Sequence, residues 1–209
     1  MMEKLIKTIE DLKKSKIKNL VSSRIQEFKK IGEESDNKIF NELCFCILTA
    51  NFNAEKTIKI QKTIGNGFLT FPESLLTEKL KKLGYRYPKT RAKYIVEARK
   101  YKDTLKTLFK SFKDDYEIRE WLIKNVRGFG YKEASHFLRN IGYTNFAIID
   151  FHIVNLLEKY GLIKKPKQLT KRKYLEIENL LRKIAERLNL SLAELDLYLW
   201  YMETGKILK

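Results

Sequence analysis

Apolar residues recur at helical spacing along almost the whole chain. In the segment after Asn19, for example, Val21, Ile25 and Phe28 fall on one face of a helix. Only three prolines and nine glycines interrupt the 209 residues, and we find no convincing alternation of the kind that predicts a β-strand. The sequence therefore predicts an all-α fold in which most helices present one apolar stripe to a core.

Local signals mark where several of these helices begin and end. Gly32 is predicted to end the helix that contains Phe28. Ser191 and Glu194 have the spacing of a capping box, so we expect the last helix to begin there. Gly205 is expected to end that helix.

The chain is strongly basic, with a formal net charge of +17 and an isoelectric point near 9.7. Such a charge is typical either of a lysine-rich surface, as in proteins from hot environments, or of a protein that binds a polyanion. A nucleic-acid backbone is the most economical partner, because lysines displace its condensed counterions. Charge alone separates neither DNA from RNA nor either of them from an anionic membrane.

No apolar run approaches the ~20 residues needed to cross a bilayer. The segment 1–18 is amphipathic and contains acidic residues, and it lacks the apolar core of a signal peptide. We therefore expect a cytoplasmic protein. The only cysteines, Cys44 and Cys46, point in different directions on a helix, so they are expected to be reduced core residues rather than a disulfide or a metal-binding pair.

The stretch from Val126 to Asp150 has the clearest functional pattern. It reads as a helix end, a turn formed by Gly128, Phe129 and Gly130, and a second helix with an apolar stripe. Two glycines permit a tight turn whose backbone N–H groups, at a helix N-terminus, attract an anion such as a DNA phosphate. An ordinary connection between two helices has the same pattern, and the turn alone leaves both interpretations open.

Two charged residues flank the second helix of this stretch. Lys132 stands in its first turn, where the helix dipole disfavours a cation and so favours the neutral, nucleophilic amine. A solvated or phosphate-binding lysine is the alternative. Asp150 follows an apolar run and opens the next helix, a position typical of an N-cap that is also compatible with facing a cleft.

The run from Gly128 to Asp150 resembles the helix-hairpin-helix motif of the base-excision DNA glycosylases that include endonuclease III. In bifunctional members a catalytic lysine follows the turn and a catalytic aspartate lies about one helix and loop later, as Lys132 and Asp150 do here. Further segments resemble the type 2 8-oxoguanine DNA glycosylase/AP lyases of archaea and some bacteria, namely residues 48–51, 85–87, 93–95, 132–140 and 197–201 with a terminal Lys209. This resemblance covers nearly the whole chain.

The resemblance implies a bifunctional enzyme that flips 8-oxoguanine out of DNA, excises it and nicks the strand by β-elimination. Lys132 is then the amine that forms a Schiff base with the sugar, and Asp150 stabilises the positive charge that develops on the sugar. Asn51, with its neighbour Asn53, is expected to fill the gap that the flipped base leaves. Capping of the helix that begins at Ala54 is the alternative for both asparagines.

The resemblance also implies residues that bind the flipped base. Tyr87 and Trp200 are the aromatic candidates for stacking on it, and His136 is a candidate because it lies one helical turn beyond Lys132. Lys209 is expected to help read the damaged base. Trp200 as a core residue and His136 as a surface residue are the alternatives.

No metal site made of side chains and no cofactor is expected. The resemblance implies at most a monovalent cation bound by the backbone at Gly128 and Gly130. No cysteine follows Cys46, so the four-cysteine iron–sulfur cluster typical of enzymes similar to endonuclease III is excluded.

By the same resemblance the fold should be a two-lobed helix-hairpin-helix DNA glycosylase fold. Residues 32–143 are predicted to form a central helical bundle, and residues 1–31 with 144–209 the second lobe. The expected partner of this monomer is double-stranded DNA with 8-oxoguanine or an abasic site. Two other functions stay open, namely excision of another oxidised base or a mismatch, and DNA binding by a helix-hairpin-helix module without catalysis.

Overall fold

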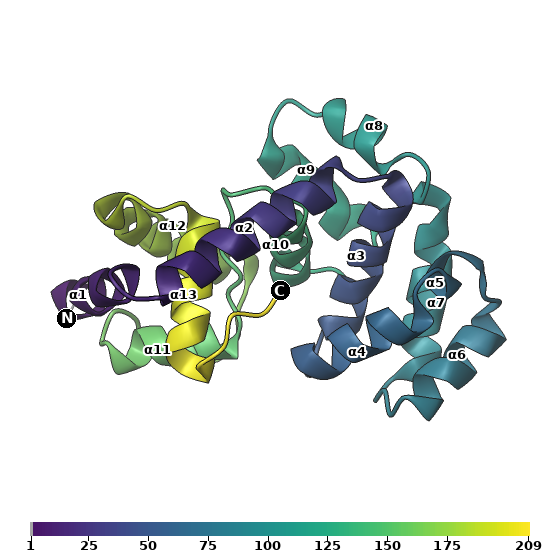
Figure 1. Cartoon of the computed structure of the whole chain (residues 1–209), viewed down its shortest axis with the longest axis horizontal. Helices are drawn as coiled ribbons and strands as arrows, with labels where there is room; N and C mark the ends of the chain where they lie inside the picture. Colours follow the sequence, from purple (N-terminus) through teal and green to yellow (C-terminus); the bar gives the residue numbers. More distant parts are fainter. Residues whose placement is uncertain (1) are drawn as a thin grey trace.

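The computed structural model describes residues 2–209, and within them the chain is helical without a β-strand (Figure 1). The predicted all-α fold is thus confirmed. None of the described helices is long and apolar enough to cross a membrane. The helices are α1 (Met2–Lys13), α2 (Ile17–Glu33), α3 (Asp36–Thr49), α4 (Ala54–Ile64), α5 (Gly67–Thr70), α6 (Glu73–Lys82), α7 (Pro88–Ala98), the 3₁₀-helix η1 (Arg99–Tyr101), α8 (Leu105–Lys110), α9 (Asp115–Asn125), α10 (Tyr131–Asn140), α11 (Phe151–Lys159), α12 (Lys171–Leu188) and α13 (Leu192–Thr204).

Buried apolar residues form two separate clusters. The first contains residues between Ile39 and Phe146, with α3 and α10 at its centre, and it includes both cysteines. The second contains apolar residues of α1 and α2 together with residues 147–199. Figure 1 shows α3 to α8 on one side, α1 with α11 to α13 on the other, and α2 and α10 between them. The exact division at residues 32 and 144 stays a prediction.

The prediction that Gly32 ends its helix is wrong, because α2 continues to Glu33. A Cβ atom at Gly32 would lie 2.1 Å from the backbone oxygen of Ile141, just beyond the end of α10. The glycine is therefore explained by the close approach of two chain segments and not by a helix end.

The other predicted helix ends agree with the structure. Ser191 and Glu194 form the capping box of α13, and Gly205 follows that helix in the left-handed conformation, with φ of 70°. Two short elements, α5 and α8, have no counterpart in the sequence prediction. Each is too short to show a helical repeat.

An extended run, residues 146–150, connects α10 to α11 and depends on side chains for its hydrogen bonds. The backbone N–H of Ala147 donates to Glu178 at 3.3 Å, that of Ile148 to Asp196 at 3.0 Å, and that of Ile149 to the Tyr174 hydroxyl at 3.3 Å. Because no strand within residues 2–209 pairs with this buried run, these side chains satisfy backbone groups that would otherwise be costly to bury. They also fix the position of Asp150 at the end of this run.

Two buried ion pairs join the two clusters. Arg119 on α9 donates to both carboxylate oxygens of Glu178 on α12, at 2.6 and 2.9 Å. Arg139 on α10 pairs with Asp196 on α13. All four side chains are at least 95% buried, so each charge relies on its partner for the stabilisation that water would otherwise supply.

We expect Glu178→Gln to lower the free energy of unfolding by about 3 kcal/mol, because the Arg119 charge then stays buried without its counter-charge. Urea unfolding followed by circular dichroism measures this change. The matched control is Glu78→Gln, which breaks an exposed ion pair with Lys82 and should leave the free energy of unfolding nearly unchanged. Equal losses in the two variants would contradict a structural role for the buried pair.

Asp196 should make stability depend on pH. Burial raises the pKa of its carboxyl from 3.8 to about 6, although Arg139 and the Ile148 N–H oppose the shift. The folded protein therefore holds a proton that the unfolded chain releases between about pH 4 and 6. As a result, stability attributable to this proton falls as pH rises through that interval and is constant above about pH 7.

The measurement is the difference in unfolding free energy between the unchanged chain and Asp196→Asn, taken from pH 4 to 8. Between pH 4 and 6, we expect the unfolding free energy of the unchanged chain to fall by about 2–3 kcal/mol relative to that of Asp196→Asn. A difference that does not vary with pH would contradict the raised pKa of Asp196.

Candidate functional site

A cavity of about 880 Å³ lies where the two clusters meet. Its wall combines α10 and the loop after α3 with the start of α11, the end of α13 and the chain that follows α13. Most residues that the sequence singles out line it, namely Asn51, Asn53, Lys132, His136, Asp150, Trp200 and Lys209. Gly128, Phe129, Gly130 and Tyr87 do not line it.

The hairpin between α9 and α10 needs a glycine at Gly128 only. Gly128 has φ of +89°, and a Cβ atom there would lie 2.7 Å from the Tyr94 ring and 2.8 Å from the Arg91 guanidinium. Gly130 has φ of −113°, and a Cβ atom would meet nothing closer than 3.4 Å. The expectation that both glycines make the turn possible is thus corrected.

Two N–H groups of the hairpin already have partners. The N–H of Phe129 donates to the Val126 carbonyl at 3.1 Å, and that of Gly130 donates to the Glu133 carboxylate at 3.2 Å. The sequence suggested that the N–H groups of the turn are free to bind an anion. These two are not free, because each already donates a hydrogen bond within the protein. The Phe129 ring is buried and lies 6.2 Å from the Phe137 ring, so it holds the turn against α10.

Cationic side chains surround the hairpin instead. The guanidinium groups of Arg91 and Arg127 lie 5.4 and 5.1 Å from the centre of the Tyr94 ring. Arg127 is exposed and pairs with Glu97 at 3.1 Å. Gly128 thus lies beside positive charge that is suited to a phosphate group.

Lys132 is the second residue of α10, and its side chain is 24% exposed at the cavity. The nearest carboxylate is Glu133, with 3.8 Å between Lys132 Nζ and Glu133 Oε1. Glu133 meanwhile uses its other oxygen to cap the N-terminus of α10. The amine is therefore accessible from the cavity and is not held in a short ion pair.

Asp150 caps α11 and faces the same cavity. Its Oδ1 accepts hydrogen bonds from the N–H groups of His152 at 2.9 Å and Ile153 at 3.1 Å. Among the described residues 2–209, no side chain or backbone group donates to Oδ2. Asp150 therefore both caps α11 and faces the cavity, two roles that the sequence had left compatible.

His136 and Trp200 bring buried polar atoms to the cavity wall. Within residues 2–209, neither ring nitrogen of His136 nor Nε1 of Trp200 has a hydrogen-bond partner of good geometry, although the Lys209 backbone lies beside the imidazole. Burial lowers the pKa of His136 well below its ordinary value, and the nearby charges of Arg139 and Lys132 lower it further. The imidazole is therefore neutral at neutral pH, with one donor and one acceptor. Unsatisfied groups of this kind are uncommon in proteins and indicate a ligand.

The two asparagines of the loop after α3 differ in their roles. Asn53 caps α4, since its side chain accepts a hydrogen bond from the Lys56 N–H at 3.0 Å. Asn51 is exposed and adopts the left-handed conformation, with φ of 58°, which asparagine tolerates better than most residues. A hydrogen bond from Arg91 to the Ala50 carbonyl holds this loop in place.

Tyr87 is not brought into the cavity. Its side chain is 41% exposed at the start of α7, and the preceding residue, Arg86, lines the cavity instead. The two residues still lie together, because the Arg86 guanidinium is 5.0 Å from the Tyr87 ring.

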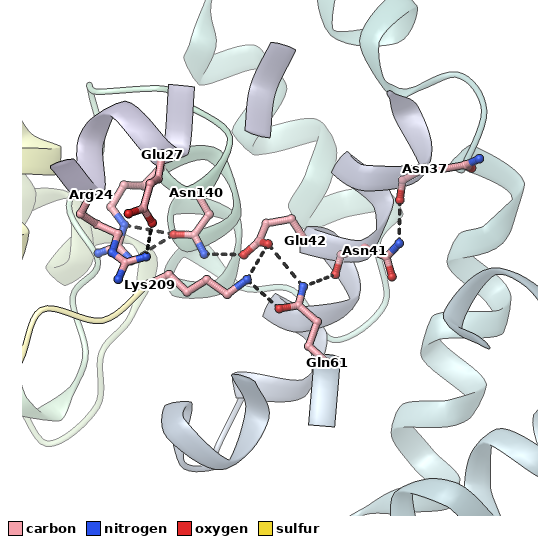
Figure 2. Close-up of polar contacts among 9 residues, drawn as sticks. Arg24, Glu27, Asn37, Asn41, Glu42, Gln61, Asn140 and Lys209 are labelled. Carbon is pink, nitrogen blue, oxygen red and sulfur yellow. Dashed lines mark hydrogen bonds and ion pairs between the residues drawn. The ribbon is translucent and has the colours of Figure 1, made fainter. Parts of the chain in front are cut away.

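Sequence reasoning missed several residues around the cavity. Asp196 and Arg139 line it as a buried ion pair, and Glu42 forms a buried network with Lys209 behind the wall (Figure 2). A usable signal was present, because Glu42 directly precedes the apolar run from Leu43 to Leu48 and Asp196 lies between two leucines. Phe151 also lines the cavity with a side chain that is 64% exposed, which is unusual for phenylalanine.

Comparison with known proteins agrees with this geometry. Residues 21–190 match the family model described as 8-oxoguanine DNA glycosylase. A relative named 8-oxoguanine DNA glycosylase/AP lyase from Methanocaldococcus jannaschii is 57% identical over 98% of this chain and 99% of its own length. One from Korarchaeum cryptofilum with the same name is 50% identical over 100% of this chain and 99% of its own.

A solved structure is also similar throughout. The M. jannaschii 8-oxoguanine glycosylase/lyase, in complex with a 15mer DNA containing 8-oxoguanine, aligns with a TM-score of 0.95 and 56% identity, over 98% of this chain and 99% of that chain. The sequence match, the two-cluster helical fold and the hairpin thus lead to one assignment. The chain belongs to the 8-oxoguanine DNA glycosylase family.

Proposed function

We propose that this protein excises 8-oxoguanine from double-stranded DNA and then nicks the strand at the resulting abasic site. The observation that carries the proposal is that one cavity contains an accessible amine, a carboxylate and unsatisfied polar atoms of His136 and Trp200. The DNA-bound relative from M. jannaschii supports it, since that protein was solved with DNA containing 8-oxoguanine.

The reaction begins at the amine of Lys132. Its lone pair attacks C1′ of the damaged nucleotide, and the C1′–N9 bond breaks as its electron pair leaves with the base, which takes up a proton. The nitrogen then loses a proton, and its lone pair expels O4′, which is protonated as the sugar opens to a Schiff base. Loss of a C2′ proton breaks the bond from C3′ to the phosphate oxygen, and water finally releases the lysine.

Asp150 stabilises the first of these steps. As the base leaves, positive charge develops on the sugar, and a fixed carboxylate nearby lowers the energy of that state. One oxygen is held by the N-terminus of α11, so the carboxylate has a defined orientation before the substrate binds. The same group assists removal of the proton from the attacking amine.

The flipped base binds against His136 and Trp200. The edge of 8-oxoguanine has both hydrogen-bond donors and acceptors, and a neutral imidazole with an indole N–H offers complementary groups. The Trp200 ring provides an aromatic face to replace the stacking that the base loses on leaving the helix. Lys209 forms part of the same wall.

The DNA backbone binds along the basic surface beside the hairpin. The net charge of +17 and the exposed Arg127, which directly precedes Gly128, support this placement. Among residues 2–209, the Gly128 carbonyl oxygen accepts no hydrogen bond, whereas that of Gly130 accepts one from the Ala134 N–H at 3.0 Å. Of the two carbonyls expected to bind a monovalent cation, only that of Gly128 is therefore free to do so. Asn51, exposed at the cavity edge, fills the gap in the duplex. We propose that the protein acts as a monomer and that it acts in the cytoplasm.

Borohydride reduction on a duplex containing 8-oxoguanine tests the covalent step. The unchanged chain should form a stable protein–DNA adduct, and Lys132→Gln should form none because no amine reaches C1′. Asp150→Asn should slow base release by about 10²- to 10⁴-fold. Lys124→Gln removes an exposed lysine of α9 and is the matched control, in which the adduct should persist. An adduct with Lys132→Gln would exclude Lys132 as the nucleophile.

A set of duplexes with different lesions tests the choice of base. We expect 8-oxoguanine to be released at least about 100-fold faster than thymine glycol, a mismatched base or undamaged guanine, because a site with fixed polar groups rejects bases that leave them unpaired. Single-turnover assays measure these rates. Equal release of thymine glycol and 8-oxoguanine would favour the alternative of a glycosylase for other oxidised bases.

A further inference from the structure

The chain after α13 crosses from one cluster of helices to the other. It leaves α13 at Gly205 and ends near the middle of the molecule, between α13 and α3 (Figure 1). We refer to residues 205–209 as the tail. Its residues Lys206, Leu208 and Lys209 line the cavity, so the position of the tail determines the shape of one cavity wall.

The Lys209 side chain is held by two residues of the opposite cluster. Its ammonium donates to Glu42 Oε2 at 2.8 Å and to Gln61 Oε1 at 2.6 Å (Figure 2). It also lies 4.5 Å from the centre of the Phe45 ring. Only 16% of the Lys209 side chain and 4% of the Glu42 side chain are exposed. The ammonium is therefore committed to the protein and is not free to turn toward a ligand.

The acceptors are themselves fixed. Gln61 donates through Nε2 to the Asn41 carbonyl at 3.0 Å and to Glu42 at 3.3 Å, which orients its oxygen toward Lys209. The other oxygen of Glu42 accepts a hydrogen bond from Asn140 at 2.8 Å. Asn140 is the last residue of α10, the helix that begins beside Lys132. Glu42 thus connects the tail to the helix that carries the amine.

We propose that Glu42 and Gln61 are positioning residues that seat the Lys209 ammonium and thereby set the discrimination between 8-oxoguanine and guanine. They act through the tail and do not contact the base. This inference rests on the proposed function, since it concerns which base the cavity accepts. A second contact of the tail, between Lys206 and Glu55, is largely exposed, and surface ion pairs of this kind contribute little.

The test compares Glu42→Gln, Gln61→Leu and the control Glu55→Gln. Each is assayed for single-turnover release of 8-oxoguanine, for release of guanine, and for nicking of a preformed abasic site. We expect the ratio of 8-oxoguanine to guanine release to fall about 10-fold or more in Glu42→Gln, the order expected for a lost charge-assisted hydrogen bond. Gln61→Leu should give a smaller loss in the same direction, and Glu55→Gln a change below about 2-fold.

A double-mutant cycle shows whether Glu42 acts through Lys209. If it does, Glu42→Gln combined with Lys209→Met should lose no more discrimination than Lys209→Met alone. Additive losses would overturn the proposal, as would an unchanged ratio in both Glu42→Gln and Gln61→Leu, or equal losses in Glu42→Gln and Glu55→Gln.

Nicking separates this inference from the proposed function. An unchanged chain that neither releases 8-oxoguanine nor nicks an abasic site refutes the proposed function itself. If the unchanged chain is active but its Glu42 and Gln61 variants keep full discrimination, only the positioning role of Glu42 and Gln61 is refuted. Gln61 is only half-buried, so its variant remains informative if Glu42→Gln fails to fold.

Discussion

The buried ion pair between Arg139 and Asp196 is the contact on which the rest of the site depends. It joins α10, the helix of Lys132, to α13, the helix of Trp200. Asp196 also accepts the Ile148 N–H and so fixes the run that leads to Asp150. One carboxylate therefore constrains three parts of the cavity wall. Removing either charge would leave the other buried without a partner, which is far more costly than losing a surface ion pair.

This arrangement explains why a site can be built from distant parts of the chain. The two apolar clusters supply most of the burial, but burial is non-directional and does not fix the orientation of one cluster against the other. The two buried arginine–carboxylate pairs are directional, and both cross between the clusters. We infer that they give the cavity a defined shape before DNA binds, as catalysis by fixed charges requires.

Much of the fold was predictable from the sequence because helical periodicity and caps are local. The α13 capping box and the apolar faces of α2 and α12 follow from residues a few positions apart. Gly32 was misassigned because its cause is a contact with Ile141, more than a hundred residues away. Lys132 and Asp150 were found by the resemblance of their spacing to a motif. The partners of Asp196, Glu42 and Lys209 were not predicted, because no local sequence pattern indicates which buried charges will pair in the fold.

We expect the damaged base to enter the cavity between the two clusters. A crystal structure of the Lys132→Gln protein with a duplex containing 8-oxoguanine tests it most directly. We predict a flipped base beside His136 and Trp200, with C1′ of its sugar facing residue 132 and the Asp150 carboxylate. A base that stays stacked in the duplex, or that binds outside this cavity, would contradict this prediction.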